Sequence, residues 1–208
     1  VQSQPNVVAN VGNKGVVAIA KALSWGALGE VVEITPGQDV TPVIGYNIAT
    51  AQAQFLREMM RGTDSTSCPT KILLYRYAGS NGVKAGATLG GLSVTARYEG
   101  ARGNDITIAI IADPDNSGVF EVQTIVDGVV VGTQNASAIG DLTDNAWVTF
   151  SGTAATALVA NAGTALTGGV DPTVTAADDA AFLTAIEPYT FDIIAYDGET
   201  QTVADAYV

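Results

Sequence analysis

Short apolar runs separated by turns dominate the pattern of hydrophobic positions along this chain. In the first eighty residues these runs are continuous rather than alternating, which is typical of strands that are buried on both faces. We therefore predict strands at 15–20, 30–34 and 72–77. The last run, ILLYRY, shows little alternation in its first half, so we expect a sheet covered on both sides.

One segment between these strands has helical periodicity. Its apolar residues recur at three- and four-residue spacing and are Ile48, Ala51, Phe55, Leu56 and Met59. They predict a helix over 47–61 with Asn47 as an acceptable N-cap. Arg57 and Arg61 lie near its C-terminus, where the helix dipole favours cations, and Gly62 is the expected stop.

The middle of the chain has a different character. A glycine-rich stretch without periodicity, 78–91, predicts a linker and a domain boundary. Beyond it the predicted strands are 92–98, 106–111, 120–126, 129–133 and 146–150. Asp127-Gly128 between two apolar runs is a strong hairpin signal, and short strands at this spacing indicate an antiparallel sandwich or barrel.

After residue 169 helix and strand alternate again. Thr175 is a suitable cap for a helix over 175–187, and a strand at 191–196 and the start of a helix at 200–208 are expected to follow. The predicted fold is therefore α+β: an α/β-type layered domain with an inserted antiparallel β sandwich or barrel. We expect residues 1–80 and 170–208 to form the discontinuous α/β domain and 81–169 the inserted β domain.

Two glycine knots lie toward the two ends of the expected insertion. The seven residues that we single out in them are Gly100, Arg102, Gly103, Asn104, Gly168, Gly169 and Asp171. By itself the first knot, GARGN, could be an anion-binding loop with Arg102 as its cation. Within an inserted β domain it is interpreted as a turn whose glycines shape the backbone and whose arginine bridges a local carbonyl or carboxylate.

Charge is distributed unevenly along the chain. All nine basic residues precede position 103, whereas the remaining residues carry fifteen acids and no base, and the net charge is −12. Such an acidic surface disfavours partners such as nucleic acid and anionic membranes. It serves solubility, or it lets the basic half of one copy contact the acidic half of another.

The side-chain inventory does not predict catalysis. The chain has no histidine, and its one cysteine, Cys68, permits neither an intrachain disulfide nor a thiolate metal cluster. The segment 113–118, DPDNSG, imitates the start of a calcium loop, but the twelfth position of that loop holds Thr124 instead of glutamate. A hairpin turn is favoured there, and we predict a protein that is not an enzyme and has no cofactor or metal site.

Two other interaction classes also receive little support. Tyr75, Tyr77 and Tyr98 could form a stacking platform for single-stranded nucleic acid together with Arg76, but the acidic balance favours packing. Residues 151–170 carry no charge across twenty positions, yet few of them are large and apolar, so no membrane insertion is predicted.

Three motifs carry a family resemblance. NKGVVAIAKALSWGALGEVVEI (13–34), YEGARGNDITIAI (98–110) and LTGGVD (166–171) occur in order along the chain. Together they resemble the tail sheath proteins of contractile-tailed bacteriophages, R-type bacteriocins and related prophage particles. The chain ends soon after residues 191–196, so it is expected to be a fragment without that family's C-terminal domain.

The resemblance implies a mechanical function. Such a protein polymerises with other copies of itself around a tail tube, is connected to a baseplate, and contracts to drive the tube through a cell envelope. It is assembled in the cytoplasm of the host bacterium and resides in the virion tail sheath. The alternative hypothesis is an acidic cell-surface or adhesion β module of a bacterial envelope protein, which fits the composition of 92–150 but not the flanking α/β pattern.

Overall fold

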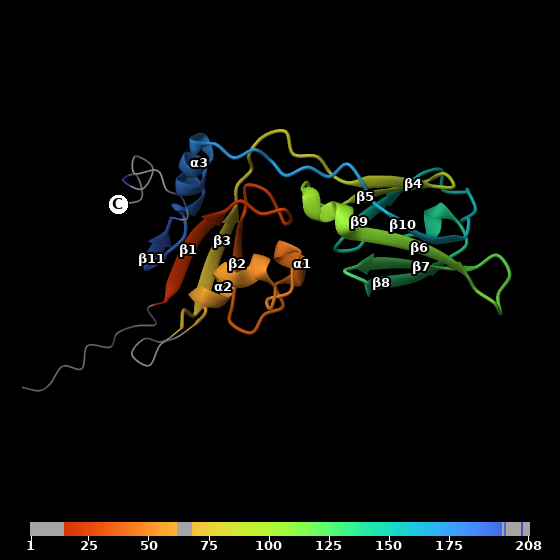
Figure 1. Cartoon of the computed structure of the whole chain (residues 1–208), viewed down its shortest axis with the longest axis horizontal. Coiled ribbons are helices and arrows are strands. Elements are labelled where there is room, and N and C mark those ends of the chain that lie inside the picture. The colour runs from red at the N-terminus through yellow and green to blue at the C-terminus, as the bar shows by residue number, and fades with distance from the viewer. Residues whose placement is uncertain (1–14, 62–67, 197, 199–204, 206–208) are drawn as a thin grey trace, which may run out of the picture.

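The strands form three sheets in two groups. The computed structural model describes residues 15–61, 68–196, 198 and 205 (Figure 1). We call the first group, with its helices, the α/β part (described residues up to 79 and from 172) and the second the β part (80–171). The predicted helix at 200–208 lies almost wholly outside the described residues.

The sheet of the α/β part has the strand order β11–β1–β3–β2. Its strands are β1 (Val16–Lys21), β2 (Val31–Ile34), β3 (Lys71–Arg76) and β11 (Ile193–Ala195). Strand β1 runs parallel to β3 and β11, and β2 is antiparallel to β3. All four strands agree with the sequence prediction to within a few residues at their ends.

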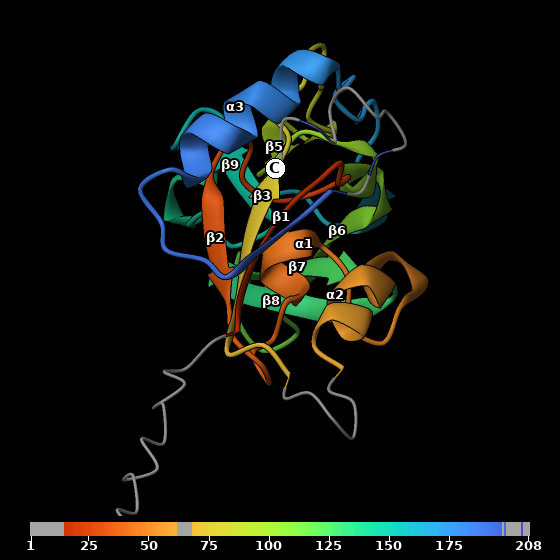
Figure 2. The same ribbon diagram turned by 90° about the vertical axis from the view of Figure 1, so that its left-hand side faces the viewer.

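Helices cover both faces of this sheet (Figure 2). On one face, α1 (Thr41–Ile44) and α2 (Gln54–Met59) supply residues to a core that contains Ile72 and Leu74 of β3. On the other, α3 (Ala176–Ile186) packs Phe182 against Leu73 and Tyr75. Successive side chains of a strand point to opposite faces, so both faces of β3 are buried, which explains its continuous apolar run.

The predicted helix over 47–61 is much shorter than expected. A 3₁₀ turn at Ala51–Ala53 precedes α2, and residues 47–50 form a local turn instead. The Asn47 side chain accepts a hydrogen bond from the Ala49 N–H at 2.9 Å, and the Arg57 guanidinium donates to the Ile48 and Thr50 carbonyls at 2.8 and 2.7 Å. These side-chain bonds take up backbone groups of residues 48–50, and the predicted stop, Gly62, lies outside the described residues.

The β part consists of two antiparallel sheets around one core. The first has the order β10–β6–β7–β8, with β6 (Ile106–Ala112), β7 (Phe120–Val126), β8 (Val129–Ala136) and β10 (Asn161–Ala165). The second has the order β4–β5–β9, with β4 (Gly86–Leu89), β5 (Leu92–Ala96) and β9 (Val148–Ser151). This arrangement confirms the predicted α+β class with an antiparallel β unit.

Two strands were missed by sequence reasoning. Strand β4 lies inside the stretch 78–91 that was expected to be a linker, and β10 lies in the charge-free segment 151–170. Their glycines obscure the pattern: Gly90 and Gly91, with φ of 57° and 92°, form the turn between β4 and β5. The Asp127-Gly128 turn has φ of 52° and 75° and joins β7 to β8, which confirms that hairpin prediction.

The two connections between the parts are paired with one another. Antiparallel bridges join Ser80 to Thr173, Val83 to Val170 and Gly86 to Thr167. Both N–H groups of each bridge donate to the carbonyl of the partner residue at 2.8–3.1 Å. The β part is therefore inserted through a two-stranded ladder rather than through two independent linkers (Figure 1).

We predict that α3 is anchored to the sheet mainly by Phe182, whose side chain is fully buried 5.4 Å from the Tyr75 ring. Phe182→Ala should lower the free energy of unfolding by about 3–5 kcal/mol, because it leaves a cavity in the core. Thr184→Ala, an exposed change on the same helix, should alter it by less than about 0.5 kcal/mol. Equal effects in urea titrations would contradict this packing.

Candidate functional site: the seam between the two parts

Arg102 lies at the centre of the contacts between the α/β part and the β part, which we call the seam. It follows Gly100 in a 3₁₀ turn, Ala101–Asp105, and only 3% of its surface is exposed. Its Nε donates to the Gly45 carbonyl of the α/β part at 2.8 Å. Its Nη1 and Nη2 donate to the two carboxylate oxygens of Asp127, in the β7–β8 turn, at 2.8 and 2.6 Å.

The remaining contacts of Arg102 also favour its charge. Asp105 accepts a bond from Nη1 at 2.9 Å, and the Tyr46 ring lies 4.3 Å below the guanidinium carbon. Burial opposes the charged form, but the hydrogen bonds to Asp127 and Asp105 outweigh it, so the pKa of Arg102 is raised. The four hydrogen bonds of Arg102, two of them bidentate to Asp127, need the fork of a planar guanidinium, whereas an ammonium has only three donors.

Arg76 crosses the seam in the opposite direction. It belongs to β3, is 3% exposed, and donates to the Leu23 and Gly26 carbonyls of the α/β part at 2.8 and 2.5 Å. Its Nη2 donates to the Glu99 carbonyl of the β part at 2.7 Å. Burial lowers the pKa of Arg76 to about 10, which leaves it charged at neutral pH. Each part thus contributes one buried arginine that binds a backbone carbonyl of the other.

An aromatic side chain crosses the seam beside these arginines. Trp25 comes from the loop after β1, yet it is fully buried in the core of the β part. Its ring lies 5.3 Å from Tyr98 in an edge-to-face arrangement and 5.0 Å from Trp147. The indole N–H has no acceptor among the described residues, which costs about 1–3 kcal/mol, so burial of the ring must contribute more than that.

The two glycine knots meet at the seam. The Asn104 side chain donates to the Gly169 carbonyl at 2.9 Å and accepts from the Gly169 N–H at 2.8 Å. Asp171 accepts from the Ala101 N–H at 2.7 Å and from the Ser24 hydroxyl at 3.0 Å. Residues about seventy positions apart are therefore joined by their own polar groups.

Different structural constraints favour glycine at the individual positions of the two knots. Gly100 has a φ of 132°, and a Cβ there would collide with the Ser24 carbonyl. At Gly103 a Cβ would lie within 3.0 Å of Ala85 and Ala96, and at Gly169 it would meet the Gly100 carbonyl. Gly168 has a φ of 82° but open space around it, so only its backbone conformation favours glycine.

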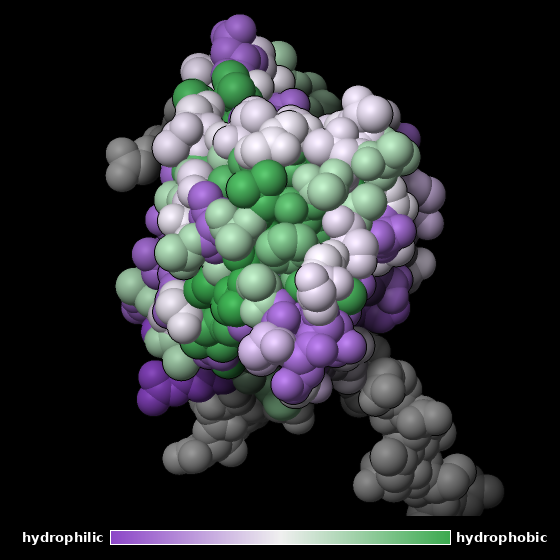
Figure 3. Space-filling model, turned by 90° about the vertical axis from the view of Figure 1, so that its right-hand side faces the viewer, coloured by the Kyte–Doolittle hydropathy of each residue, from purple (hydrophilic) through white to green (hydrophobic). Residues whose placement is uncertain are grey.

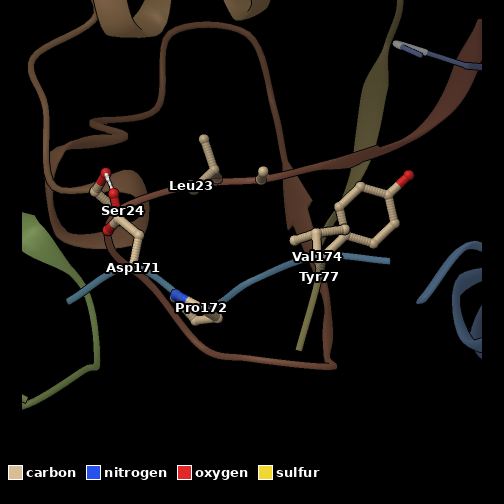
Figure 4. A pocket seen from close by; sticks show the side chains of 7 residues that line it. Leu23, Ser24, Tyr77, Asp171, Pro172 and Val174 are labelled. Carbon is tan, nitrogen blue, oxygen red and sulfur yellow. Dashed lines mark hydrogen bonds between the residues drawn. The ribbon is translucent and has the colours of Figure 1, made fainter. Parts of the chain in front are cut away.

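A small pocket borders this site. It has a volume of about 80 Å³ and is lined by Leu23, Ser24, Tyr77, Asp171, Pro172 and Val174, together with Ala22. Figure 4 shows that the Ser24–Asp171 hydrogen bond occupies one side of it. The Ser24 hydroxyl and the Asp171 carboxylate are thus bonded to each other, and the Tyr77 hydroxyl donates to Asp179 at 2.6 Å, which suits a structural joint.

The described part of the chain also bears on two other kinds of site, a metal site and a stacking platform for nucleic acid. No group of three or more potential metal ligands occurs there. Asp113 instead accepts the N–H groups of Asp115 and Asn116 at 2.8 and 3.1 Å, as in a hairpin turn. Tyr75 is buried against α3, whereas Tyr98 packs on Trp25 in the other core, so these rings pack inside the molecule, as the sequence favoured, and share no stacking platform.

The charge-free segment 151–170 ends at the seam with Gly168 and Gly169, but Val159 lies at the end of the β part away from the seam. Figure 3 shows apolar residues in the middle of this face and hydrophilic residues toward its border. Val159 is exposed and lies over Gly90 in the β4–β5 turn. Among the described residues, no helix reaches the length and hydrophobicity of a membrane span.

Sequence reasoning singled out Arg102 but missed two residues of the seam. Arg76 was considered only for stacking, and Trp25 occurs in the sequence analysis only as part of the motif at 13–34. A charged residue inside the buried run ILLYRY was the available signal, because a buried arginine needs partners for its N–H groups. Nothing local indicates that those partners are Leu23, Gly26 and Glu99.

We expect Arg102→Ala to lower the free energy of unfolding by about 2–4 kcal/mol, because the Gly45 carbonyl and two carboxylates lose their donor. Arg102→Lys keeps the positive charge but not the bidentate donor geometry of the guanidinium. It should therefore recover less than half of the lost free energy of unfolding. Chemical denaturation of both variants measures this. A fully stable alanine variant would contradict the central place of Arg102 in the seam.

The seam also predicts a dependence on pH. The hydrogen bond from Arg102 holds the pKa of Asp127 below its ordinary value of 3.8. Stability from this pair is therefore complete above about pH 4, the range of the unfolded carboxyl group, and is lost as the pH falls toward the lower folded value. Asp127→Asn should flatten the acid limb of stability against pH, which urea titrations between about pH 2 and pH 6 measure. An acid limb of the same slope in this variant would contradict the pairing.

Comparisons with known proteins agree with this architecture. The model of the phage tail sheath protein β-sandwich domain matches residues 80–171, and that of the tail sheath protein Gp18 domain III N-terminal region matches residues 14–76. Two proteins of Bacillus subtilis (strain 168) are similar: uncharacterized protein YqbK, at 34% identity, and phage-like element PBSX protein XkdK, at 32%. Each alignment covers 89% of this chain and 42% of the relative.

Solved structures give the same result. The chain superimposes on the sheath tail protein of Desulfitobacterium hafniense with a TM-score of 0.85 and 37% identity, over 100% of this chain and 46% of that one. For the sheath tail protein of Listeria innocua the TM-score is 0.81 and the identity 34%, over 94% of this chain and 43% of that one. The sequence thus spans less than half the length of these relatives. The chain belongs to the phage tail sheath protein family.

Proposed function

We propose that this chain is part of a contractile tail sheath subunit, which polymerises around a tail tube and shortens to drive the tube through a cell envelope. The family is one of structural proteins that assemble into a polymer in the phage tail. The observation that best supports the contractile role is the seam, in which Arg76 and Arg102 each bind a carbonyl of the opposite part.

The physical argument concerns the transmission of force. A contractile lattice changes length when its subunits rotate against one another at bistable interfaces. A subunit that bent internally would absorb part of that movement. The crossed arginines, the inserted Trp25 and the paired connections oppose bending, so the rotation of one part is passed to the other.

The finer assignments follow from the same proposal. We assign other copies of the chain, a tail tube protein and a baseplate as partners, and the cytoplasm of the host bacterium as the place of assembly. We also propose that residues 1–80 with 170–208 form one domain and 81–169 another. The separate cores of the two parts and the ladder between them support this division.

The use of basic residues bears on how copies meet. Arg76 and Arg102 are buried and hydrogen-bonded within the molecule. Lys71 pairs with Glu33 at 2.7 Å, and Arg57 donates to nearby backbone carbonyls. A contact of the basic half of one copy with the acidic half of another therefore has fewer bases available than the sequence suggests. Because few basic residues remain for ion pairs between copies, we propose that uncharged surfaces contribute to self-association.

Electron microscopy tests the proposal directly. The full-length protein, expressed alone and purified at several salt concentrations, should form tubes or rings of uniform diameter, and Thr184→Ala should leave them unchanged. Persistent monomers under all conditions, with a normal melting transition, would count heavily against the sheath function.

A further inference from the structure

We infer that the exposed edge of β8 at Val129–Val131 is a contact surface for a second copy of this chain. Three consecutive valines stand in the open there, with exposed fractions of 62%, 47% and 39%. In the described part of the chain, β8 ends its sheet and no strand pairs with its outer edge (Figure 1). The inference rests on the proposed sheath function, since it requires a chain that associates with itself.

The two halves of β8 differ in whether another part of the chain lies against them. Toward its C-terminal end, Gln134 donates to the Thr143 carbonyl at 2.9 Å and accepts from the Thr143 N–H at 3.0 Å. The loop that contains Thr143 and Asn145 therefore packs against β8 from Gly132 onward. The valine half has no such cover among the described residues.

The geometry of β8 increases this exposure. Ile125 pairs with Val130 and Thr124 with Gly132, so Val131 is the extra residue of a β-bulge and has no partner on β7. The preceding turn is fixed, since Asp127 is bound bidentately by Arg102. The valines are therefore presented on a rigid strand end.

Two other edge strands, β2 and β10, carry the usual protection. Strand β2 presents Glu33, which is paired with Lys71, and β10 has an irregular register between Asn161 and Thr164. Free edges without charge, proline or cover normally attract another strand. Residues 128–136 contain neither a charge nor a proline.

Charge favours a second copy as the occupant. This chain carries a net charge of −12, so contact between copies is favoured at surfaces without charge, such as residues 128–136. Asp127, which precedes the valines, is bound by Arg102. The family to which the chain belongs is also one of proteins that assemble into a polymer.

Hydrogen exchange and assembly of the full-length protein test this inference. In assembled particles the amides of 129–131 should exchange about tenfold more slowly than in the unassembled protein. Val130→Lys, which would bury an unpaired charge, should weaken assembly by at least about tenfold. Val159→Lys, at an exposed valine on the far end of the β part, should assemble normally.

The possible results separate the two proposals. If the wild type assembles while exchange at 129–131 stays the same, or folded Val130→Lys assembles normally, the edge contact is wrong and the sheath function stands. Protection that is already present in the unassembled protein would also overturn it, in favour of cover by the protein's own chain. If the wild type never assembles, the proposed function fails and the edge contact fails with it. Should Val130→Lys not fold, the exchange of the wild type decides.

Discussion

A buried guanidinium must find partners for its N–H groups, and at Arg102 those partners come from both parts of the molecule. The Gly45 carbonyl is supplied by the α/β part, whereas Asp105 and Asp127 belong to the β part. Leaving such a cation unpaired is costly, so the two parts are stable only in the relative position that satisfies it. The polar contacts of Arg102 therefore help to fix the position of the α/β part relative to the β part.

The apolar contacts of the seam act in the same direction. Trp25 extends from a loop of the α/β part into the core of the β part, and Gly45 leaves room for its side chain, because a Cβ at residue 45 would collide with it. The two buried arginines, the inserted Trp25 and the ladder of paired connections are three kinds of contact that fix one geometry. A molecule built this way is suited to carry load between neighbours in a polymer.

Local sequence patterns predicted most of the strands and the β7–β8 turn. Contacts between residues far apart in the sequence could not be predicted from such patterns. The β7–β8 hairpin was predicted because Asp127-Gly128 specifies its own turn, and β3 because both its faces are buried. The helix over 47–61 was overestimated, since the hydrogen bonds of Asn47 and Arg57 to nearby backbone groups compete with helical ones. The partners of the seam could not be predicted, because they are brought together only by the insertion of one part into the other.

The most direct measurement is the structure of the assembled full-length protein before and after contraction, determined by electron cryomicroscopy. If the seam makes the subunit rigid, the contacts of Arg102 with Gly45 and of Arg76 with Glu99 will be present in both states, and only the contacts between subunits will differ. Separation of these pairs in either state would contradict the account, because the subunit would then bend at the seam.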